Sequence, residues 1–274
     1  MVPVIEVDGA RIPAVGLGTM TLKGDVCVEA VRAALRMGYR HIDTASFYAN
    51  EAEVGEGIRK SGVPRDDIFL TTKVKFSDLA PGDFEAAVEG SLNRLGLPYV
   101  DLLLIHWPSP ELPPAAYIPS LCQAKRKGQA KHIGVANFTR ALLDEAEKVA
   151  DERLVNNQIE VHPFLDQRTI LTDCKRRGMA VTAYCPLGRG RIPGNAVLER
   201  VAKTHGKTEA QVALRWLVQQ GLIPIPRTAT PEKMKQNLNV FDFLLAESEM
   251  ADIAALAEPD GRVITPPQAP EWDR

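Results

Sequence analysis

The chain has 274 residues, of which 45% are hydrophobic and 25% charged, a composition typical of globular proteins. Its formal net charge of −2 at pH 7 provides neither a basic surface for nucleic acid nor a polybasic anchor for a membrane. No apolar run approaches the roughly 18 residues that a membrane span needs, and residues 1–6 lack the features of a signal peptide. We therefore expect a cytoplasmic protein with no nucleic-acid or membrane partner.

The predicted elements begin with a β-hairpin, because residues 4–7 and 11–15 flank an Asp8-Gly9 turn. Apolar runs typical of buried strands then alternate with helical patterns. The expected strands are 16–20, 39–45, 68–74, 100–107, 131–137, 156–161, 179–186 and 222–227. The expected helices are 25–37, 51–60, 81–95, 113–127, 139–150, 165–177, 196–204, 209–219 and 246–256. Two of them, 196–204 and 209–219, fall between the seventh and eighth strands, so one is an insertion after strand seven.

Eight strands that alternate with helices, in a chain of this length, are typical of an α/β fold of the (β/α)8 TIM-barrel type. We expect one domain, residues 1–274, with the hairpin at its N-terminus and a Pro-rich tail, 261–274, over the active-site face. Gly16 and Gly18 resemble half of a dinucleotide fingerprint. The third glycine and the following helix are missing, so a Rossmann fold is not predicted.

Single polar side chains end four of the predicted strands. Asp43, Lys73, His106 and Asn137 each follow an apolar run, so all four should lie at the carboxyl ends of successive strands. In an eight-stranded α/β barrel the catalytic residues lie at that end. An isolated charge there would be expensive to desolvate, and Asp43 and Lys73 would compensate each other as an ion pair.

Tyr48 lies in the loop after the second strand, close in sequence to Asp43. A lysine beside a tyrosine favours the phenolate, so we expect the pKa of Tyr48 to fall below its usual value of about 10. Tyr48 would then act as a general acid, with His106 bonded to the same substrate oxygen. The other possibility for any one of these polar residues is simple exposure at the rim of the barrel.

At this point the residues resemble a known family, the aldo-keto reductases. The similarity runs nearly from end to end and rests on Asp43-Thr44-Ala45 with Tyr48 and Asn50-Glu51, Thr72-Lys73, Leu104-Ile105-His106-Trp107-Pro108, Gly134-Val135-Ala136-Asn137-Phe138, Asn157-Gln158-Ile159-Glu160 and Tyr184-Cys185-Pro186-Leu187-Gly188. Within the family the chain is most similar to the bacterial 2,5-diketo-D-gluconate reductases, including the small type that also reduces methylglyoxal. The closing segment 269–273 supports that subgroup.

The resemblance implies NADPH-dependent reduction of aldehydes and ketones, with a small carbonyl compound as substrate. It makes Asp43, Tyr48, Lys73 and His106 the catalytic tetrad. It assigns the cofactor to Gly18, Thr19, Asn137, Gln158, Tyr184, Leu187, Gly188, Arg227, Thr228, Lys233, Gln236 and Asn237, and the substrate to Met20, Phe47, Lys75, Trp107 and Trp272. Asn137 and Gln158 would hold the nicotinamide carboxamide, Tyr184 would stack on its ring, and the residues from Arg227 onward would grip the adenosine 2′-phosphate.

Several positions depart from the family pattern. Ala136 and Cys185 stand where serine is common, while Lys233 and Gln236 replace an arginine and a glutamate near the adenine. Many members have tryptophan in place of Lys75. Met20 stands at another pocket position where many members have tryptophan. The departures affect substrate choice more than the type of reaction.

Three other functions remain open. A Schiff-base aldolase would use Lys73 as its nucleophile, but such a lysine must be neutral, and Asp43 would keep it charged. A regulatory subunit would bind the nicotinamide with little turnover. A metal hydrolase has the least support, because the cysteines (27, 122, 174 and 185) and histidines lack metal-ligand spacing, so we expect no metal and reduced thiols. We expect a monomer.

Overall fold

The computed structural model describes residues 2–258 and 260–273. In this part of the chain, eight parallel strands form one sheet in the order β3 to β10. They are β3 (Leu17–Gly18), β4 (His41–Asp43), β5 (Phe69–Val74), β6 (Val100–Ile105), β7 (Ala130–Ala136), β8 (Leu154–Glu160), β9 (Ala180–Tyr184) and β10 (Ile223–Pro224). The sheet closes on itself where the amides of Gly16 and Gly18 donate to the carbonyls of Pro224 and Pro226, at 3.0 and 3.2 Å. The predicted (β/α)8 barrel is confirmed.

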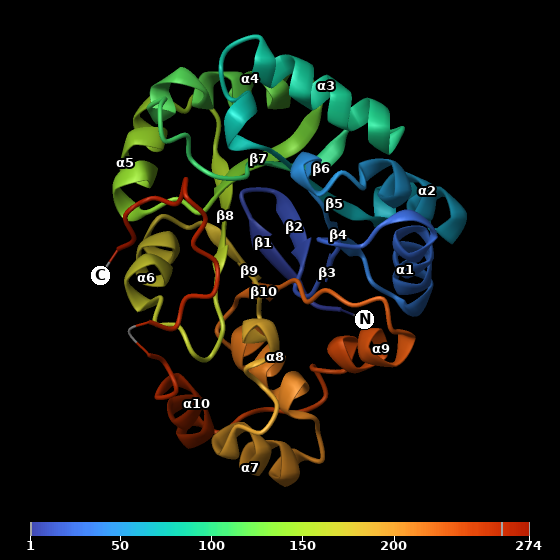
Figure 1. Ribbon diagram of the computed structural model, residues 1–274, viewed down its shortest axis with the longest axis vertical. Helices are drawn as coiled ribbons and strands as arrows, with labels where there is room; N and C mark the ends of the chain where they lie inside the picture. Colours follow the sequence, from blue (N-terminus) through green and yellow to red (C-terminus); the bar gives the residue numbers. More distant parts are fainter. Residues whose placement is uncertain (1, 259, 274) are drawn as a thin grey trace.

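Within the described residues, ten helices accompany the strands, and most of them form an outer ring in Figure 1. They are α1 (Gly24–Met37), α2 (Glu51–Ser61), α3 (Asp83–Leu95), α4 (Ile118–Arg126), α5 (Arg140–Val149), α6 (Arg168–Arg176), α7 (Ala196–His205), α8 (Glu209–Gln219), α9 (Pro231–Leu238) and α10 (Glu247–Ala254). α9 packs against α1 and α8 and completes the ring. α7 and α8 are the two helices predicted between the seventh and eighth barrel strands, and α7 packs beside α10.

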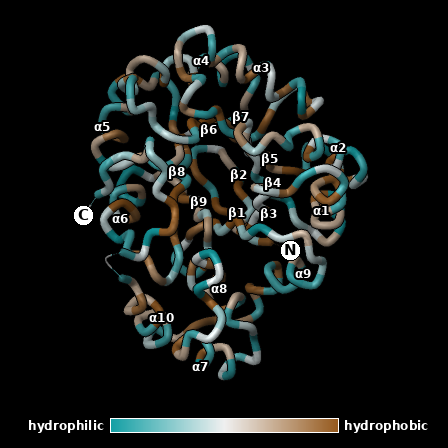
Figure 2. The backbone as a smooth tube through the Cα atoms, in the orientation of Figure 1, coloured by the Kyte–Doolittle hydropathy of each residue, from teal (hydrophilic) through white to brown (hydrophobic). Residues whose placement is uncertain are grey.

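The predicted hairpin, β1 (Val4–Val7) and β2 (Ala10–Pro13), plugs one mouth of the barrel. Ala10 and Ile12 pack against Phe69, Ala180 and Ile223, which begin three of the barrel strands. The hairpin therefore closes the amino-terminal mouth. In Figure 1 it lies within the ring of strands, and Figure 2 shows the hydrophobic segments concentrated there, with hydrophilic segments mostly on the outer helices.

Several elements are shorter than the sequence predicts. β3, β4 and β10 keep only the residues that pair in register with a neighbouring strand, although the flanking amides of Thr19 and Ile225 still donate to the carbonyls of Asp43 and Ala183. The expected helix 113–127 is a 3₁₀ turn, Pro114–Ala116, followed by α4. Pro119 lacks an amide hydrogen and cannot continue the helical hydrogen bonding from that turn, which explains the break. α6 begins at Arg168 rather than at 165, since Leu165 bridges to Glu258 near the start of the tail.

The tail lies at the carboxyl-terminal mouth, as predicted. Its residues Val263 and Ile264 contact the end of β8, and Asp273 accepts from the Arg140 amide at the start of α5, at 3.0 Å. The open mouth of the barrel is thus partly roofed by the tail. Among the helices described, none is long and apolar enough to cross a membrane.

Candidate active site

Strand alternation aims the predicted catalytic residues into the carboxyl-terminal mouth. Side chains two apart on a strand share one face. Phe69 and Leu102 face the barrel interior, so Lys73 on β5 and His106 after β6 follow on that same face. Asp43 ends β4, the neighbour of β5 in the sheet. Four neighbouring strands, β4 to β7, therefore carry the four polar ends that the sequence singled out.

Lys73 and Asp43 form a buried ion pair. The Lys73 Nζ lies 2.5 Å from the Asp43 Oδ1, and the two side chains are 0% and 2% exposed. The same Nζ donates to the Thr44 carbonyl at 2.8 Å and to the Tyr48 hydroxyl at 3.4 Å. All three ammonium hydrogens thus have acceptors. Burial lowers the pKa of Lys73, and the Asp43 charge opposes that shift.

Tyr48 ends the 3₁₀ turn Ser46–Tyr48, and its ring stands edge-on to the His106 ring with the centroids 5.6 Å apart. The buried Asn50 fixes this loop, since its amide donates to the carbonyls of Thr19 and Leu22 at 2.9 and 3.0 Å. The Lys23 ammonium also donates to the Tyr48 carbonyl. The phenol is therefore positioned by contacts on both sides of the loop.

The predicted direction of the Tyr48 pKa shift is wrong for this structure. Burial and the negative charge of Asp43 raise the pKa of Tyr48 well above its usual value of 10, because both disfavour a phenolate. The expectation from the sequence included the effect of the Lys73 charge on the Tyr48 pKa, but not the effect of burying the phenol. A raised pKa keeps the hydroxyl protonated at neutral pH, which is the state that a proton donor needs. Burial, with a smaller contribution from Lys73, lowers the pKa of His106 well below 6.5, so its imidazole is neutral.

The residues predicted to hold the nicotinamide lie in one hydrogen-bonded chain beside this pair. The Gln158 amide donates to the Asp43 Oδ2 at 2.7 Å, and the Asn137 amide donates to the His106 carbonyl at 3.0 Å. The Tyr184 hydroxyl donates to the Asn137 side-chain oxygen at 2.8 Å. A half-buried ring with its hydroxyl tied down in this way is fixed in orientation, as a stacking platform requires.

The residues predicted for the rest of the cofactor occupy the joint between β3 and β10. Gly18 pairs with Arg227, and a Cβ on Gly18 would come within 2.7 Å of the Ile225 carbonyl oxygen, so the strands touch there. Arg227, Lys233 and Gln236 are exposed around the start of α9, whereas Thr228 and Asn237 are buried. Leu187 and Gly188 follow β9, and the Thr19 hydroxyl donates to the Asp43 carbonyl at 2.9 Å. In the described part of the chain, no hydrogen bond or ion pair joins Arg227, Lys233 or Gln236 to the tetrad.

The predicted substrate residues lie around the same mouth, with one exception. Phe47 is 68% exposed and its ring lies 6.2 Å from that of His106. Trp107 packs edge-on to Trp272 of the tail, at 6.0 Å between centroids, and Met20 is exposed after β3. Lys75 instead pairs with Asp78 at 3.4 Å, within the turn after β5. The Lys75 ammonium is therefore paired with a carboxylate of the same turn. A comparison with the family pattern does not reveal such a local contact.

Comparison with known proteins agrees with this geometry. Residues 14–258 match the model of the aldo/keto reductase family. The chain belongs to the aldo-keto reductase family. This confirms the family predicted from the motifs, and with it the oxidoreductase class.

Individual aldo-keto reductases resemble the chain over almost its whole length. A crystal structure provisionally named 2,5-diketo-D-gluconic acid reductase B is 44% identical, with a TM-score of 0.98 over 100% of this chain and 98% of that one. The methylglyoxal reductase DkgB of Escherichia coli O157:H7 is 40% identical over 96% of this chain and 99% of its own. A Bombyx mori aldo-keto reductase in complex with NADP is 35% identical, with a TM-score of 0.88 over 94% and 93% of the two chains.

Sequence reasoning gave no role to three residues that shape this aldo-keto reductase site. Asn50 ties the Tyr48 loop to the segment after β3, Glu160 binds the tail, and Arg262 stacks on Trp272. Asn50 and Glu160 both lie within the family motifs. Glu160 also stands at the end of its strand, as Asp43 does, but Asn156, Asn157 and Gln158 interrupt the apolar run in β8, so the rule that identified Asp43 does not single it out.

Backbone strain also marks this mouth. Thr21, Ala49, Asn137, Cys185 and Arg189 have positive φ values between 48° and 70° and lie in segments that follow strand ends. Such conformations cost about 1–3 kcal/mol for residues other than glycine and persist only where the surroundings enforce them. Asn137 is the clearest case, because its φ of 63° accompanies the hydrogen bonds to His106 and Tyr184.

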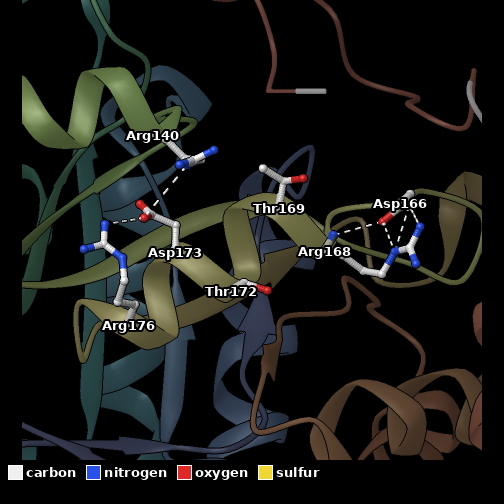
Figure 3. Close-up of a pocket in the computed structure, with 7 residues that line it drawn as sticks. All are labelled: Arg140, Asp166, Arg168, Thr169, Thr172, Asp173 and Arg176. Carbon is white, nitrogen blue, oxygen red and sulfur yellow. Dashed lines mark hydrogen bonds and ion pairs between the residues drawn. The ribbon is translucent and has the colours of Figure 1, made fainter.

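A separate surface hollow lies between α5 and α6, away from the tetrad (Figure 3). It is lined by Arg140, Asp166, Arg168, Thr169, Thr172, Asp173 and Arg176. Asp173 pairs with Arg176 at 2.6 Å and Asp166 pairs with Arg168 at 2.6 Å. These ion pairs account for most of the charge in the hollow. Within residues 2–258 and 260–273, no group of three or more His, Cys, Asp or Glu residues is arranged to hold a metal ion.

Proposed function

We propose that the protein reduces small aldehydes and ketones to alcohols with NADPH, and that Tyr48 donates the proton. The observation that carries the proposal is the chain Asp43–Lys73–Tyr48, in which one buried ammonium links the carboxylate at 2.5 Å to the phenol at 3.4 Å. A phenol that loses its proton beside a cation is stabilised as it does so. The edge-on His106 adds a neutral donor to the same space.

The residues present fit a nicotinamide dinucleotide. Tyr184 is held in place by Asn137, and Gln158 lies against Asp43, which gives an aromatic platform and two amides at one point. Farther along, the cations of Arg227 and Lys233 make no ion pair within the described part of the chain and flank the start of α9. An anion such as a 2′-phosphate would be favourable there. When bound, NADPH supplies the hydride.

The chain's own residues prepare the carbonyl. Its oxygen would accept hydrogen bonds from Tyr48 and His106, both of which stay uncharged at neutral pH because burial opposes their ionisation. As negative charge develops on that oxygen, Tyr48 gives up its proton, and Lys73 offsets the charge left on the phenol. Asp43, in turn, holds Lys73 in position through the 2.5 Å contact.

Methylglyoxal and 2,5-diketo-D-gluconate are the substrates that we favour. The names of two similar proteins, a methylglyoxal reductase and a 2,5-diketo-D-gluconic acid reductase B, support this choice. Phe47 and Met20 are exposed apolar side chains at the mouth, and they suit a compact carbonyl compound. The monomeric state and the cytoplasmic location stay predictions.

Two alternative functions on the same fold, a Schiff-base aldolase and a nicotinamide-binding regulatory subunit, have less support. An aldolase would need Lys73 free to attack a carbonyl, but this Nζ is buried and occupied by three acceptors. A regulatory subunit with little turnover would not need the Asp43–Lys73–Tyr48 chain. Borohydride trapping with a carbonyl substrate would test the aldolase directly, since a Schiff base on Lys73 would become covalent.

Cofactor choice tests the proposal. We expect NADPH to bind at least about tenfold more tightly than NADH, because charge-assisted hydrogen bonds contribute roughly 1.5–3 kcal/mol each. Arg227→Ala should remove most of that preference. The measurement is cofactor fluorescence titration at two salt concentrations, followed by steady-state reduction of methylglyoxal. Lys235→Ala is the matched control, as another exposed α9 cation. Equal affinities in the parent protein would contradict the phosphate site, and absent turnover would contradict the enzyme proposal.

A further inference from the structure

The carboxylate of Glu160 is buried at the end of β8 and is bonded to the tail. Its residue is 0% exposed. The Val263 amide donates to Oε1 at 2.6 Å and the Ile264 amide to Oε2 at 3.0 Å. The same Oε1 also lies 2.9 Å from the His162 Nε2. The Glu160 carboxylate thus connects the end of β8 to the loop that follows it and to two consecutive backbone amides of the tail, more than a hundred residues later in the chain.

The tail reaches this carboxylate from a tightly fixed starting point. The Glu258 amide donates to the Phe164 carbonyl at 3.1 Å, and the Gly261 amide donates to the Glu258 carbonyl at 3.1 Å. A Cβ on Gly261 would overlap the Phe164 carbonyl, so the tail backbone runs directly against the loop after β8. Only a narrow range of directions is left to the chain when it passes Glu160.

From Glu160 a line of contacts leads to the substrate residues. Arg262 has its Nη1 4.0 Å from the Glu160 Oε2, and its guanidinium carbon lies 3.6 Å from the centre of the Trp272 ring. Trp272 packs edge-on to Trp107, which directly follows His106. The position of the tail, and with it Trp272, therefore depends on contacts that begin at the Glu160 carboxylate.

The same strand also supports the tetrad. Gln158 and Glu160 stand two residues apart on β8, so their side chains share a face. Gln158 donates to Asp43 while Glu160 accepts from the tail. Within the described residues, Glu160 makes no hydrogen bond to Asp43, Tyr48, Lys73 or His106, so we do not expect it to act on the substrate directly.

We propose that Glu160 is a positioning residue that holds the tail against the substrate site and thereby sets which carbonyl compounds bind well. This inference rests on the proposed carbonyl reduction. A substrate large enough to touch Trp107 and Trp272 gains from an ordered tail, whereas a very small one does not. Loss of the anchor should therefore raise KM for the larger substrate, since the tail must then be ordered during binding.

Glu160→Gln is the informative variant, because it keeps the shape of the side chain. It leaves one oxygen acceptor and turns an NH₂ group toward the other tail amide, so one of the two amides loses its partner. Glu271→Gln is the matched control, with the same chemical change on an exposed residue of the same tail. The substrates are methylglyoxal and phenylglyoxal, which differ only by a methyl and a phenyl group beside the same dicarbonyl.

We expect Glu160→Gln to raise KM for phenylglyoxal about fivefold or more with kcat within about twofold, and to change KM for methylglyoxal less than about twofold. NADPH affinity should stay unchanged. Glu271→Gln should match the parent throughout. In a double variant with Trp272→Ala, the phenylglyoxal effects should be less than additive, because both changes act on one tail. Equal losses of kcat on both substrates, or weakened NADPH binding, would overturn the proposal.

Limited trypsin digestion tests the anchor independently of catalysis. The Arg262–Val263 bond is a trypsin site whose Val263 amide is bonded to Glu160 in the intact protein. Release of the 263–274 fragment, followed by mass spectrometry, should be several-fold faster in Glu160→Gln than in the parent or in Glu271→Gln. If the parent protein reduces no carbonyl compound, the proposed function is wrong, but the digestion experiment still tests whether Glu160 anchors the tail. Equal cleavage rates would overturn the anchoring role.

Discussion

At the scale of single residues, burial decides the protonation of the candidate site more than any one neighbouring charge does. Tyr48 has an ammonium 3.4 Å from its hydroxyl, yet its pKa is raised because desolvation and Asp43 act in the opposite direction. His106 is kept neutral by the same desolvation. The free enzyme therefore holds two uncharged donors over one buried ion pair, and charge would develop only during the reaction.

The first prediction concerns the proton donor. Tyr48→Phe should lower kcat for methylglyoxal by about 10²–10⁴-fold, the usual contribution of general acid catalysis. Lys73 keeps two acceptors, Asp43 and the Thr44 carbonyl, so we expect little change in melting temperature or in NADPH affinity. Steady-state kinetics, thermal unfolding and a fluorescence titration provide the three measurements. A variant that keeps more than a tenth of the parent rate would exclude Tyr48 from this role.

Lys73→Met separates catalysis from structure. It should also lower kcat strongly, but in addition it leaves Asp43 buried with Gln158 and without its cation. Removing one partner of a buried pair costs about 3–5 kcal/mol, so the free energy of unfolding should fall by that order. Urea unfolding of both variants would reveal the difference. Equal stability of Lys73→Met and Tyr48→Phe would mean that Asp43 finds another partner or becomes protonated.

At the scale of elements, two helical glycines stand in different environments, and only one of them lies at a close contact between helices. Gly55 in α2 lies against α3, and a Cβ there would overlap the Leu95 carbonyl. Gly90 in α3 has only the end of the flexible Arg94 side chain nearby, at 3.0 Å. The same substitution should therefore have opposite effects at the two positions.

Gly55→Ala should destabilise the protein by about 1–3 kcal/mol, because backbone atoms cannot move aside easily. Gly90→Ala should stabilise it by up to about 1 kcal/mol through its higher helix propensity. Urea unfolding monitored by circular dichroism would measure the change in unfolding free energy for both variants. A stabilising Gly55→Ala would show that α2 and α3 can separate without loss, contrary to the packing described above.

The sequence predicts the site best where the fold itself aligns residues. Asp43, Lys73, His106 and Asn137 end neighbouring parallel strands, so a polar residue after each apolar run was enough to bring them together. Contacts made across long sequence distances carried no such signal. Glu160 and Val263 are 103 residues apart, and nothing in either segment alone indicates the pairing. The Lys75–Asp78 contact and the Tyr48 desolvation likewise depend on side-chain positions that no periodic pattern specifies.

At the scale of the whole molecule, buried histidines link stability to pH. Burial lowers the pKa of His41 from 6.5 to about 4, and the nearby Asp43 opposes this only in part. The unfolded chain keeps a value near 6.5, so it binds more protons than the folded protein between these two pH values. The stabilisation from a neutral His41 is thus complete above about pH 6.5 and is lost as the pH falls toward 4.

His41→Gln should flatten this dependence. The amide retains a polar group near the Thr71 hydroxyl, which lies 3.2 Å from the histidine Nε2. Between about pH 6 and 4.5, we expect the parent to lose up to about 1.4 kcal/mol more per pH unit than the variant, corresponding to one proton. Urea unfolding of the parent and the variant at several pH values supplies the comparison. Parallel curves for parent and His41→Gln would contradict the assignment.

The hairpin plug has a practical consequence for attaching the protein to a support. β1 and β2 occupy the amino-terminal mouth, while the tail crosses the opposite mouth beside Trp107. A linker joined before Val2 would leave the substrate entrance facing away from the surface. A linker joined after Asp273, whose carboxylate accepts from the Arg140 amide, would pull directly on the segment that roofs that entrance. Sensors and immobilised catalysts built from this barrel should therefore be tethered through the hairpin end.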